Sequence, residues 1–383
     1  MEIQSVKNKV LLVENFASDF YGARLPLAKS LVSEGWDVYA MIPSGSEYVS
    51  MIQQQGIQVI QYDLDRKNKG FFQLYHLLKT YRRIIKEHDF KIVHSFRFQP
   101  NLINALSGIG KKHRKVLHIT GLGIAFSNPS IKYRVLKFIS QIVFLIMLYL
   151  ADIVIVQNPN DIDDIWASNP FKRKIRLIYG SGIDVHKYSS SSFERKNIRR
   201  DLGIHEEQKL FICVTRLIWE KGIKELVDAF TLVNAGNKNF ILYIVGWSDY
   251  DNPRHVTDQF INSVTKESGI NFLGKRTDIP QLLAASDIFI FPSYYREGIP
   301  RSLLEALAMG LPIITTDMPG CKMTVANEVN GLIIQPRSVE EIINAINKIL
   351  RLNILEMGKR SRELAIEEFQ DRIIFQKISD TYK

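Results

Sequence analysis

Hydrophobic and polar positions alternate along the N-terminal half in a pattern that predicts strands separated by helices. Between the strands, residues 24–34 and 71–87 carry apolar side chains at helical spacing. Alternation of this kind is typical of βα units and a parallel sheet. Short runs rich in β-branched residues predict strands at residues 10–13, 38–42, 59–62, 92–94, 116–120, 153–156 and 175–178.

The same alternation returns in the C-terminal half after an interruption. Residues 189–192 are all serine and a charged stretch follows, which is typical of a linker. Helical spacing then predominates from residue 338 to about residue 382. Further strands are predicted at residues 210–215, 241–245, 270–273, 288–291 and 313–316.

These patterns predict an α/β protein with two Rossmann-like domains that face each other across a cleft. We expect the domains at residues 1–185 and 206–365, with a linker at 186–205. A C-terminal helix at 366–383 is expected to pack back on the N-terminal domain. Ligands of open parallel sheets bind at the carboxyl ends of the strands, so the cleft is the expected site.

Composition places the 383-residue chain among ordinary globular proteins, with 46% hydrophobic and 23% charged residues. Two cysteines without metal-ligand spacing do not make a disulfide framework, which fits a reducing cytosol. The N-terminus shows no secretory signal pattern. The longest apolar run, residues 142–151, has ten residues against about 20 for a membrane span. No transmembrane helix is therefore expected.

The net charge of +10 lies entirely in the first half of the chain. Residues 1–180 contain 24 Lys and Arg against 14 Asp and Glu, whereas residues 181–383 contain 26 of each kind. A basic cluster lies at residues 111–115, and Lys132, Arg134 and Lys137 lead into the apolar stretch 138–151. Such a stretch suits an anionic membrane surface. A buried core helix is the alternative interpretation.

The segment 290–316 carries the most informative chemistry. A predicted strand ends at Phe291, and Glu297, Gly298 and Pro300 precede a helix that contains Glu305. Neither half has a complete GxGxxG or Walker A motif, which disfavours a bound dinucleotide. Two carboxylates eight residues apart suit two hydroxyl-bearing parts of one ligand. Alternatively, Glu305 is a solvated helix residue and Glu297 only complements the helix dipole.

A second candidate is the pair Arg216 and Lys221, which follows a predicted strand. Two cations in one strand-end loop suit a diphosphate. Two unpaired surface cations are the alternative.

A family resemblance is carried by the segments RLIWEKG, EGIPRSLLE, TDMPGC and NGLII, which resemble retaining family 4 glycosyltransferases with the GT-B fold. It extends over essentially the whole chain. The segments DFYGARLPLAKSLVSEGWDVYAMIP, IVHSFRFQPN, HITGLGIAF and IYGSGID resemble a narrower bacterial branch, which builds surface polysaccharides and glycans on undecaprenyl-diphosphate carriers.

The resemblance implies roles for individual residues. Arg216 and Lys221 would hold the donor diphosphate and stabilise the leaving nucleotide. Glu297 would contact the donor sugar, and Glu305 would bind the ribose diol. The other donor-binding positions implied are Gly22, Gly182, Gly274, Lys275, Arg276, Gly298, Ile299 and Pro300.

The acceptor side departs from the family pattern. Many members carry a histidine after the strand that corresponds to 116–120, but this chain has Thr120 and Gly121 there. We expect Thr120, Gly121 and Gly123 to line the acceptor side, and interpret His118 and His94 as structural. No metal or cofactor is expected, and the acidic pairs at 161–163 and 249–251 are interpreted as solvated or helix-capping.

The resemblance thus predicts a retaining, metal-independent hexosyltransferase at the inner face of the plasma membrane. It would move a hexose or N-acetylhexosamine from a nucleotide sugar, with a UDP-sugar favoured, to a lipid-linked saccharide of capsule, O-antigen or exopolysaccharide. A sugar-nucleotide epimerase with the GT-B fold is one alternative. A basic nucleic-acid-binding protein is another, but no aromatic residue interleaves residues 111–115, so nucleic acid is not an expected partner.

Overall fold

The computed structural model describes residues 8–64, 70–110, 112–127, 130–166, 171–235, 239–250, 252–264 and 268–383. The chain forms two compact units. Unit 1 contains Met1–Gly182 and Asp371–Lys383, and unit 2 contains Ile183–Gln370. The chain therefore passes from one unit to the other twice, after Gly182 and after Gln370.

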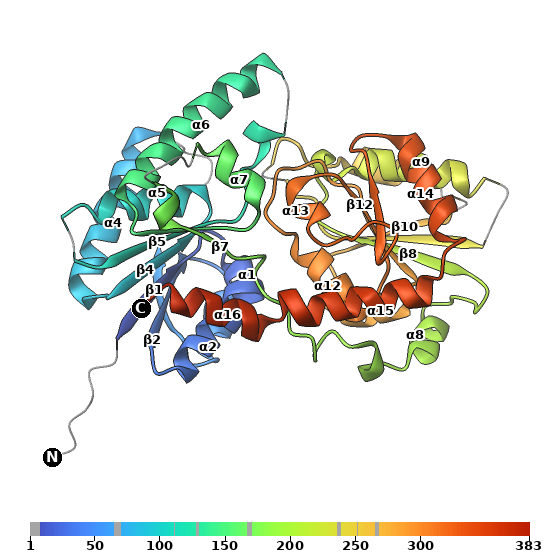
Figure 1. The fold of residues 1–383 in the computed structure, drawn as a ribbon, viewed down its shortest axis with the longest axis horizontal. Coiled ribbons are helices and arrows are strands. Elements are labelled where there is room, and N and C mark those ends of the chain that lie inside the picture. The colour runs from blue at the N-terminus through green and yellow to red at the C-terminus, as the bar shows by residue number, and fades with distance from the viewer. Residues whose placement is uncertain are drawn as a thin grey trace. The chain divides into compact units, whose positions relative to one another are not determined.

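Unit 1 is built on a seven-stranded sheet in the order β3-β2-β1-β4-β5-β6-β7, and every strand pair is parallel (Figure 1). The strands fall on the segments that the hydrophobic pattern predicts. Their bounds are β1 (Lys9–Val13), β2 (Asp37–Pro43), β3 (Gln58–Tyr62), β4 (Ile92–Phe96), β5 (Arg114–Ile119), β6 (Ile153–Val156) and β7 (Ile175–Leu177).

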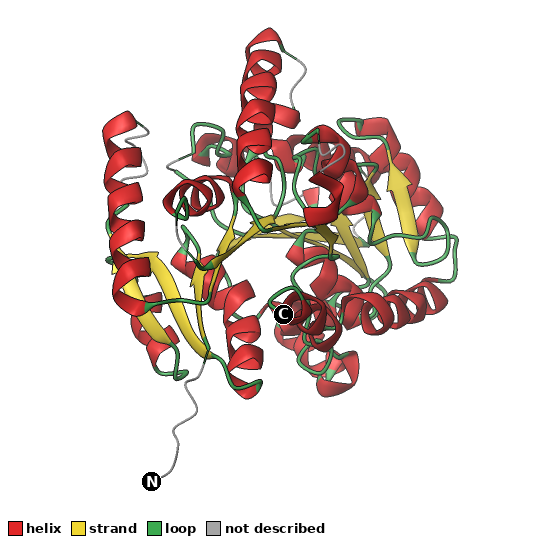
Figure 2. Ribbon diagram, turned by 60° about the vertical axis from the view of Figure 1, so that its left-hand side comes forward, coloured by secondary structure: helices red, strands yellow, loops and turns green. Residues whose placement is uncertain are grey.

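Helices cover both faces of this sheet, as the crossovers of parallel strands require (Figure 2). The α-helices are α1 (Ala17–Asp19), α2 (Leu25–Ser33), α3 (Tyr48–Gln53), α4 (Phe71–His88), α5 (Phe98–Ser107), α6 (Ile131–Leu150), α7 (Pro159–Asp164) and α16 (Asp371–Asp380). Short π or 3-10 turns are η1 (Phe20–Arg24), η2 (Ile124–Phe126) and η3 (Phe171–Lys174).

The period of two along β1 explains how the core of unit 1 divides between the two faces. Val10 and Leu12 pack in one cluster with α2 and α16, whereas Leu11 and Val13 pack in another with α4. All four side chains are fully buried. A strand covered on both faces reads as a continuous apolar run, which is why KVLLV marks this strand so clearly.

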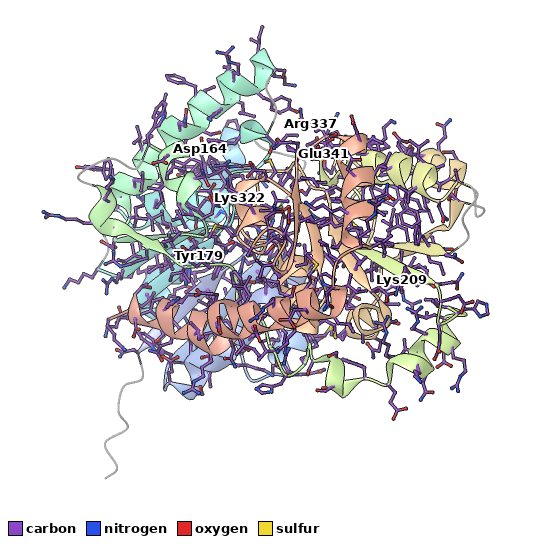
Figure 3. All side chains as sticks on the ribbon, turned by 45° about the vertical axis from the view of Figure 1, so that its right-hand side comes forward. Asp164, Tyr179, Lys209, Lys322, Arg337 and Glu341 are labelled. Atoms are coloured by element: carbon purple, nitrogen blue, oxygen red, sulfur yellow. The ribbon has the colours of Figure 1, made fainter. Side chains whose placement is uncertain are left out.

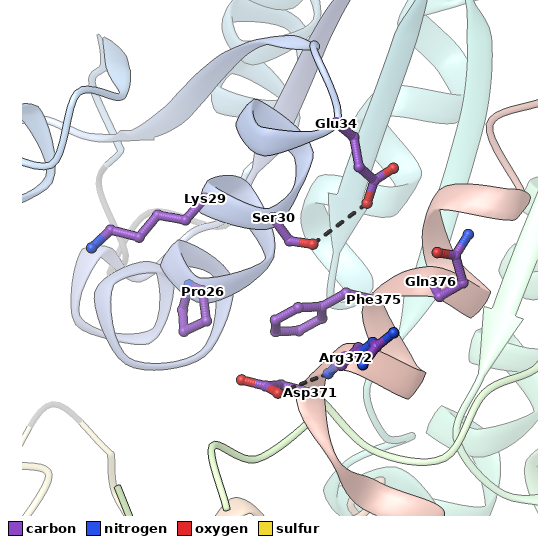
Figure 4. Close-up of a pocket in the computed structure, with 8 residues that line it drawn as sticks. All are labelled: Pro26, Lys29, Ser30, Glu34, Asp371, Arg372, Phe375 and Gln376. Atoms are coloured by element: carbon purple, nitrogen blue, oxygen red, sulfur yellow. Dashed lines mark hydrogen bonds between the residues drawn. The ribbon is translucent and has the colours of Figure 1, made fainter. Parts of the chain in front are cut away.

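The C-terminal helix α16 belongs to unit 1. Ile374, Phe375 and Ile378 join the cluster that contains α2. A hollow remains between α2 and α16, and Figure 4 shows Phe375 and Asp371 on one side of it and Pro26 and Lys29 on the other. The preceding residues Ala365–Phe369 form a π-helical turn, η7, in unit 2, so the unit boundary lies inside the segment 366–383.

Unit 2 is built on a six-stranded parallel sheet in the order β10-β9-β8-β11-β12-β13. The strands are β8 (Lys209–Val214), β9 (Phe240–Val245), β10 (Ile270–Gly274), β11 (Ile288–Phe291), β12 (Ile313–Thr316) and β13 (Gly331–Ile334). The helices are α8 (Arg195–Asp201), α9 (Ile223–Val233), α10 (Asp258–Ser263), α11 (Ile279–Ala285), α12 (Arg301–Met309), α13 (Pro319–Lys322), α14 (Val339–Ile349) and α15 (Ile354–Leu364), with 3-10 turns η4 (Ser190–Ser192) and η5 (Trp219–Lys221). Strand β13 is not among the predicted strands.

Residues 186–205, expected to be a linker, belong to unit 2 and contain α8. Asp287, at the start of β11, accepts hydrogen bonds from Arg195 at 2.9 Å and Arg199 at 3.2 Å. Arg199 is buried and also donates to backbone carbonyls. The charged stretch that predicts a linker therefore contains two arginines that bind this segment to the sheet of unit 2.

Candidate functional site

The loop after β8 places two cations at the carboxyl edge of the unit 2 sheet. Arg216 lies next to Thr215, and its guanidinium donates to Asp249 at 3.3 Å. Its side chain is 31% exposed, so it is a paired but accessible cation. Glycine is required at Gly246, after the neighbouring strand β9, because a Cβ there would lie 1.7 Å from the carbonyl oxygen of Thr215.

Lys221 ends the turn η5 and is almost fully buried, with 5% of its side chain exposed. Its Nζ donates to Glu297 Oε1 at 2.5 Å and lies 4.9 Å from the centre of the Phe291 ring. Ser293 Oγ donates to the same carboxylate oxygen at 3.2 Å. The structure thus brings together Lys221 and Glu297, which are 76 residues apart in the sequence, and Lys221 is not a surface cation.

The backbone beside Glu297 is held by a close approach from α13. A Cβ on Gly320 would lie 1.7 Å from the carbonyl oxygen of Gly298. Only glycine therefore fits at this position without moving the segment from Glu297 to Pro300. Burial and the charge of Glu297 raise the pKa of the neighbouring Cys321 thiol to about 12.

Glu305 lies one turn inside α12 and is not a solvated helix residue, because only 12% of its side chain is exposed. Arg301 Nε donates to its Oε1 at 3.1 Å. Tyr188 donates its hydroxyl proton to the same oxygen at 2.9 Å. Neither donor is predicted from the sequence. Arg301 was detectable as the i,i+4 partner of Glu305, but no local signal connects Tyr188 to it.

The segment Gly274–Arg276 follows β10 at the same edge of the sheet. Gly274 has φ +64° and its carbonyl accepts from Gly246 N–H at 2.9 Å. Arg276 makes a two-pronged ion pair with Asp278 at 2.8 and 2.6 Å. The donor-binding role that the resemblance implies for this segment stays a prediction.

The remaining predicted positions lie in unit 1. Gly22 is exposed within η1 and has open space around it. Gly182 has φ +78°, and a Cβ there would lie 2.9 Å from Asp371 Cα. The close packing against α16 is therefore enough by itself to require glycine at this position. Thr120, Gly121 and Gly123 form the turn after β5.

The carboxyl edge of the unit 1 sheet also holds a charged network that the sequence analysis missed. Glu14 is fully buried and pairs with Arg24 at 3.4 Å and Arg97 at 3.1 Å. Arg97 also pairs with Asp19 and has φ +72°, an unfavourable conformation for a non-glycine residue. A backbone in this conformation persists only where surrounding contacts stabilise it. Here the carboxylates of Glu14 and Asp19 bind the Arg97 side chain.

The two histidines behind this edge are buried strand residues. The rings of His94 and His118 stack 5.5 Å apart, and burial lowers both pKa values well below the ordinary range. His94 Nδ1 lies 2.6 Å from the hydroxyl of Tyr382, and His118 Nε2 lies 3.2 Å from Gln157 Nε2. Both contacts occur within unit 1.

Helix α6 presents an apolar surface that unit 1 does not cover. By length and composition its 20 residues meet the requirement for a membrane span, and 22% of the best window is buried, although core helices of soluble proteins meet the same requirement. The ten-residue apolar run 142–151 therefore covers only part of the length of this helix. Lys137 pairs with Asp164, labelled in Figure 3, at 3.0 Å. The exposed apolar side chains of α6 are Ile131, Val135, Leu136, Phe138, Ile139, Ile142, Ile146 and Tyr149.

Two of the predicted charged positions, Lys111 and Asp251, lie outside the described residues. Within the ranges that the structure describes, no group of three or more His, Cys, Asp or Glu side chains has the geometry to hold a metal ion.

Comparison with known proteins matches a family to the part of the chain that carries Arg216, Lys221, Glu297 and Glu305. Residues 194–367 match the family described as "Glycosyl transferases group 1". Over 98% of both chains, the sequence is 25% identical to the N,N'-diacetylbacillosaminyl-diphospho-undecaprenol alpha-1,3-N-acetylgalactosaminyltransferase of Campylobacter jejuni. It is 29% identical to the Escherichia coli UDP-Gal:alpha-D-GlcNAc-diphosphoundecaprenol alpha-1,3-galactosyltransferase over 53% of this chain and 52% of that one.

The fold agrees with this assignment. The structure of Anabaena Alr3699/HepE in complex with UDP superposes with a TM-score of 0.79, at 20% identity, over 97% of this chain and 99% of that one. Two parallel-sheet Rossmann-like units and a helical tail make this a GT-B fold, which confirms the predicted fold class. Residues 194–367 are therefore similar to the group 1 glycosyltransferases.

Proposed function

We propose that this protein is a retaining, metal-independent hexosyltransferase that uses a UDP-sugar and a lipid-linked saccharide acceptor. The observation that carries the proposal is the contact between Lys221 and Glu297. Arg216 lies in the same loop as Lys221, so two cations and a carboxylate occur at one sheet edge. This combination suits a sugar diphosphate: cations for the phosphates and an acceptor for the sugar hydroxyls.

Each of these residues would have a distinct task. Arg216 and Lys221 would neutralise the diphosphate and stabilise the charge that develops on the leaving UDP. Glu297 would accept hydrogen bonds from the donor sugar, and the backbone at Gly298, Ile299 and Pro300 would contact sugar and phosphate. Two fixed cations supply the charge that a divalent ion supplies in other enzymes, which supports metal independence.

Retention is supported by the relatives' names, and the carboxylate geometry favours same-face attack over a covalent intermediate on Glu297. Both undecaprenol-linked relatives are named as alpha-1,3-transferases. Glu297 is already engaged by Lys221 and Ser293, which makes it a poor nucleophile. The leaving phosphate would accept the proton of the attacking acceptor hydroxyl on the same face of the sugar.

The acceptor would bind to unit 1, in keeping with a basic surface and an apolar helix. The two relatives' names specify diphospho-undecaprenol acceptors, whose lipid stays in a bilayer. The turn from Thr120 to Gly123 would line the acceptor side. Exposed apolar side chains on α6, together with Lys132 and Arg134 near its N-terminus, would attach the protein to the anionic inner face of the plasma membrane.

The transfer reaction tests this proposal directly. Purified protein would be incubated with a panel of UDP-hexoses and UDP-N-acetylhexosamines, an undecaprenyl-diphosphate-linked saccharide and excess chelator. We expect one donor to be consumed, with an α-anomeric product detected by NMR. A β-linked product, or turnover only when a divalent metal replaces the chelator, would contradict the retaining or metal-independent part.

Membrane attachment has its own test. Co-sedimentation with vesicles that contain anionic lipid should be lost when Lys132, Arg134 and Lys137 are replaced by Glu. Equal sedimentation of variant and wild type would contradict the attachment.

A further inference from the structure

Tyr188 has a buried environment close to the candidate nucleotide site of unit 2. Its side chain is 5% exposed, and its hydroxyl donates to Glu305 Oε1 at 2.9 Å. The two residues are 117 positions apart. Burial and the neighbouring carboxylate raise the pKa of Tyr188 well above its ordinary value. The phenol therefore stays protonated and remains a hydrogen-bond donor at every physiological pH.

A short turn fixes the backbone that carries Tyr188. Asp184 Oδ1 accepts the N–H groups of His186 and Lys187, both at 2.9 Å, and Tyr188 N–H donates to the carbonyl of Asp184 at 3.1 Å. Ile183, the first residue of unit 2, forms a parallel bridge with Gln370. The tyrosine thus leaves a hydrogen-bonded turn and not a free loop.

A second connection attaches Tyr188 to the helix that carries Glu305. The guanidinium of Arg362 donates to the carbonyl of Tyr188 at 2.6 Å and also to the carbonyl of Ala308, near the end of α12. Tyr188 therefore contacts α12 in two ways, directly through its hydroxyl and indirectly through Arg362. Hydrogen bonds at the side-chain hydroxyl and at the backbone carbonyl of Tyr188 therefore both fix its position relative to Glu305.

The hydrogen bonds orient the carboxylate of Glu305. Arg301 Nε and the Tyr188 hydroxyl both donate to Oε1. Among the described residues, no further hydrogen bond reaches this carboxylate, so Oε2 keeps its lone pairs for a ligand. A glutamate side chain has three rotatable bonds, and fixing one oxygen with two donors removes most of that freedom before a ligand arrives.

From this geometry we infer that Tyr188 is a positioning residue that holds Glu305 in the orientation that accepts hydrogen bonds from the two ribose hydroxyls of the donor nucleotide. The inference rests on the proposed function, in which Glu305 binds that ribose. Tyr188 contributes to nucleotide affinity only through the hydrogen bonds that the ribose hydroxyls donate to Glu305. It should therefore discriminate ribonucleotides from nucleotides that lack those hydroxyls.

Calorimetric titration with UDP and with 2′,3′-dideoxy-UDP tests this inference. Tyr188→Phe should weaken UDP binding about five- to tenfold, less than the loss of a direct hydrogen bond to a charged group, because Tyr188 acts only through Glu305. It should leave dideoxy-UDP binding within about twofold of wild type, because that nucleotide cannot use the carboxylate. Arg301→Met, which removes the other donor to Oε1, should show the same selectivity. Tyr243→Phe, a buried tyrosine of β9, is the matched control and should change neither affinity.

The outcomes separate this inference from the proposal beneath it. Equal weakening of both nucleotides by Tyr188→Phe would indicate a general structural role and overturn the inference, as would unchanged UDP affinity. If wild-type protein binds UDP and dideoxy-UDP equally, Glu305 does not bind the ribose, and the proposed site fails first. Circular dichroism of each variant confirms that the loss comes from folded protein.

Discussion

The buried pair of Lys221 and Glu297 leads to an asymmetric prediction for stability. Lys221 has 5% of its side chain exposed, whereas Glu297 has 20% exposed and also accepts from Ser293. Removal of one partner of a buried ion pair costs about 3–5 kcal/mol when the remaining charge is fully enclosed. Glu297→Gln leaves the more buried charge alone, so it should lower the free energy of unfolding by about 3 kcal/mol.

Lys221→Met should cost less, about 2 kcal/mol, because the remaining carboxylate keeps a hydroxyl donor and partial contact with water. The double variant should cost about 3 kcal/mol and not the additive 5, which corresponds to a coupling of about 2 kcal/mol. Urea unfolding of the four proteins, without ligand, measures these values. Additivity within about 0.5 kcal/mol would refute the claim that the two charges stabilise each other.

Three further predictions concern packing, pH and thiol chemistry. Gly320→Ala should destabilise the protein by about 1–3 kcal/mol and weaken UDP binding, because its Cβ would overlap the carbonyl of Gly298; unchanged values in urea unfolding and calorimetry would contradict this. His94 and His118 stay neutral in the folded protein while the unfolded chain takes up protons below about pH 6.5, so each should remove up to about 1.4 kcal/mol of stability per pH unit between pH 6.5 and 5.5. His118→Asn should lose about half of that extra dependence in urea unfolding at the two pH values, and an unchanged dependence would refute the assignment. Burial raises the pKa of the Cys213 and Cys321 thiols to about 12, so a thiol reagent at pH 8 should modify neither until urea unfolds the protein.

The sequence predicts the sheets well because their strands are covered on both faces. KVLLV and IFIF are continuous apolar runs for that reason. Strand β13 escapes prediction because it begins with glycine, which is unfavourable in strands. The segment 186–205 is predicted to be a linker from its four serines and the charged stretch after them, whereas Arg195 and Arg199 pair with Asp287, about 90 residues away.

The candidate site is likewise predicted only in part from the sequence. Arg216, Lys221, Glu297 and Glu305 were identified from strand-end position, spacing and family resemblance. The groups that orient them depend on tertiary contacts, and Tyr188 reaches Glu305 across 117 residues. The network of Glu14 and Arg97 in unit 1 has the same origin, since the two residues follow strands that are neighbours only in the folded sheet.

Nucleotide titration tests the central claim most directly. Wild-type protein, Arg216→Ala, Glu305→Ala and the exposed-helix control Arg360→Ala would each be titrated calorimetrically with UDP, GDP and ADP in the presence of chelator. We predict selective UDP binding by wild type and by the Arg360 variant, and binding at least about tenfold weaker in the other two. Folded wild-type protein that binds no nucleotide, or equal UDP affinity in all four proteins, would contradict the donor site described above.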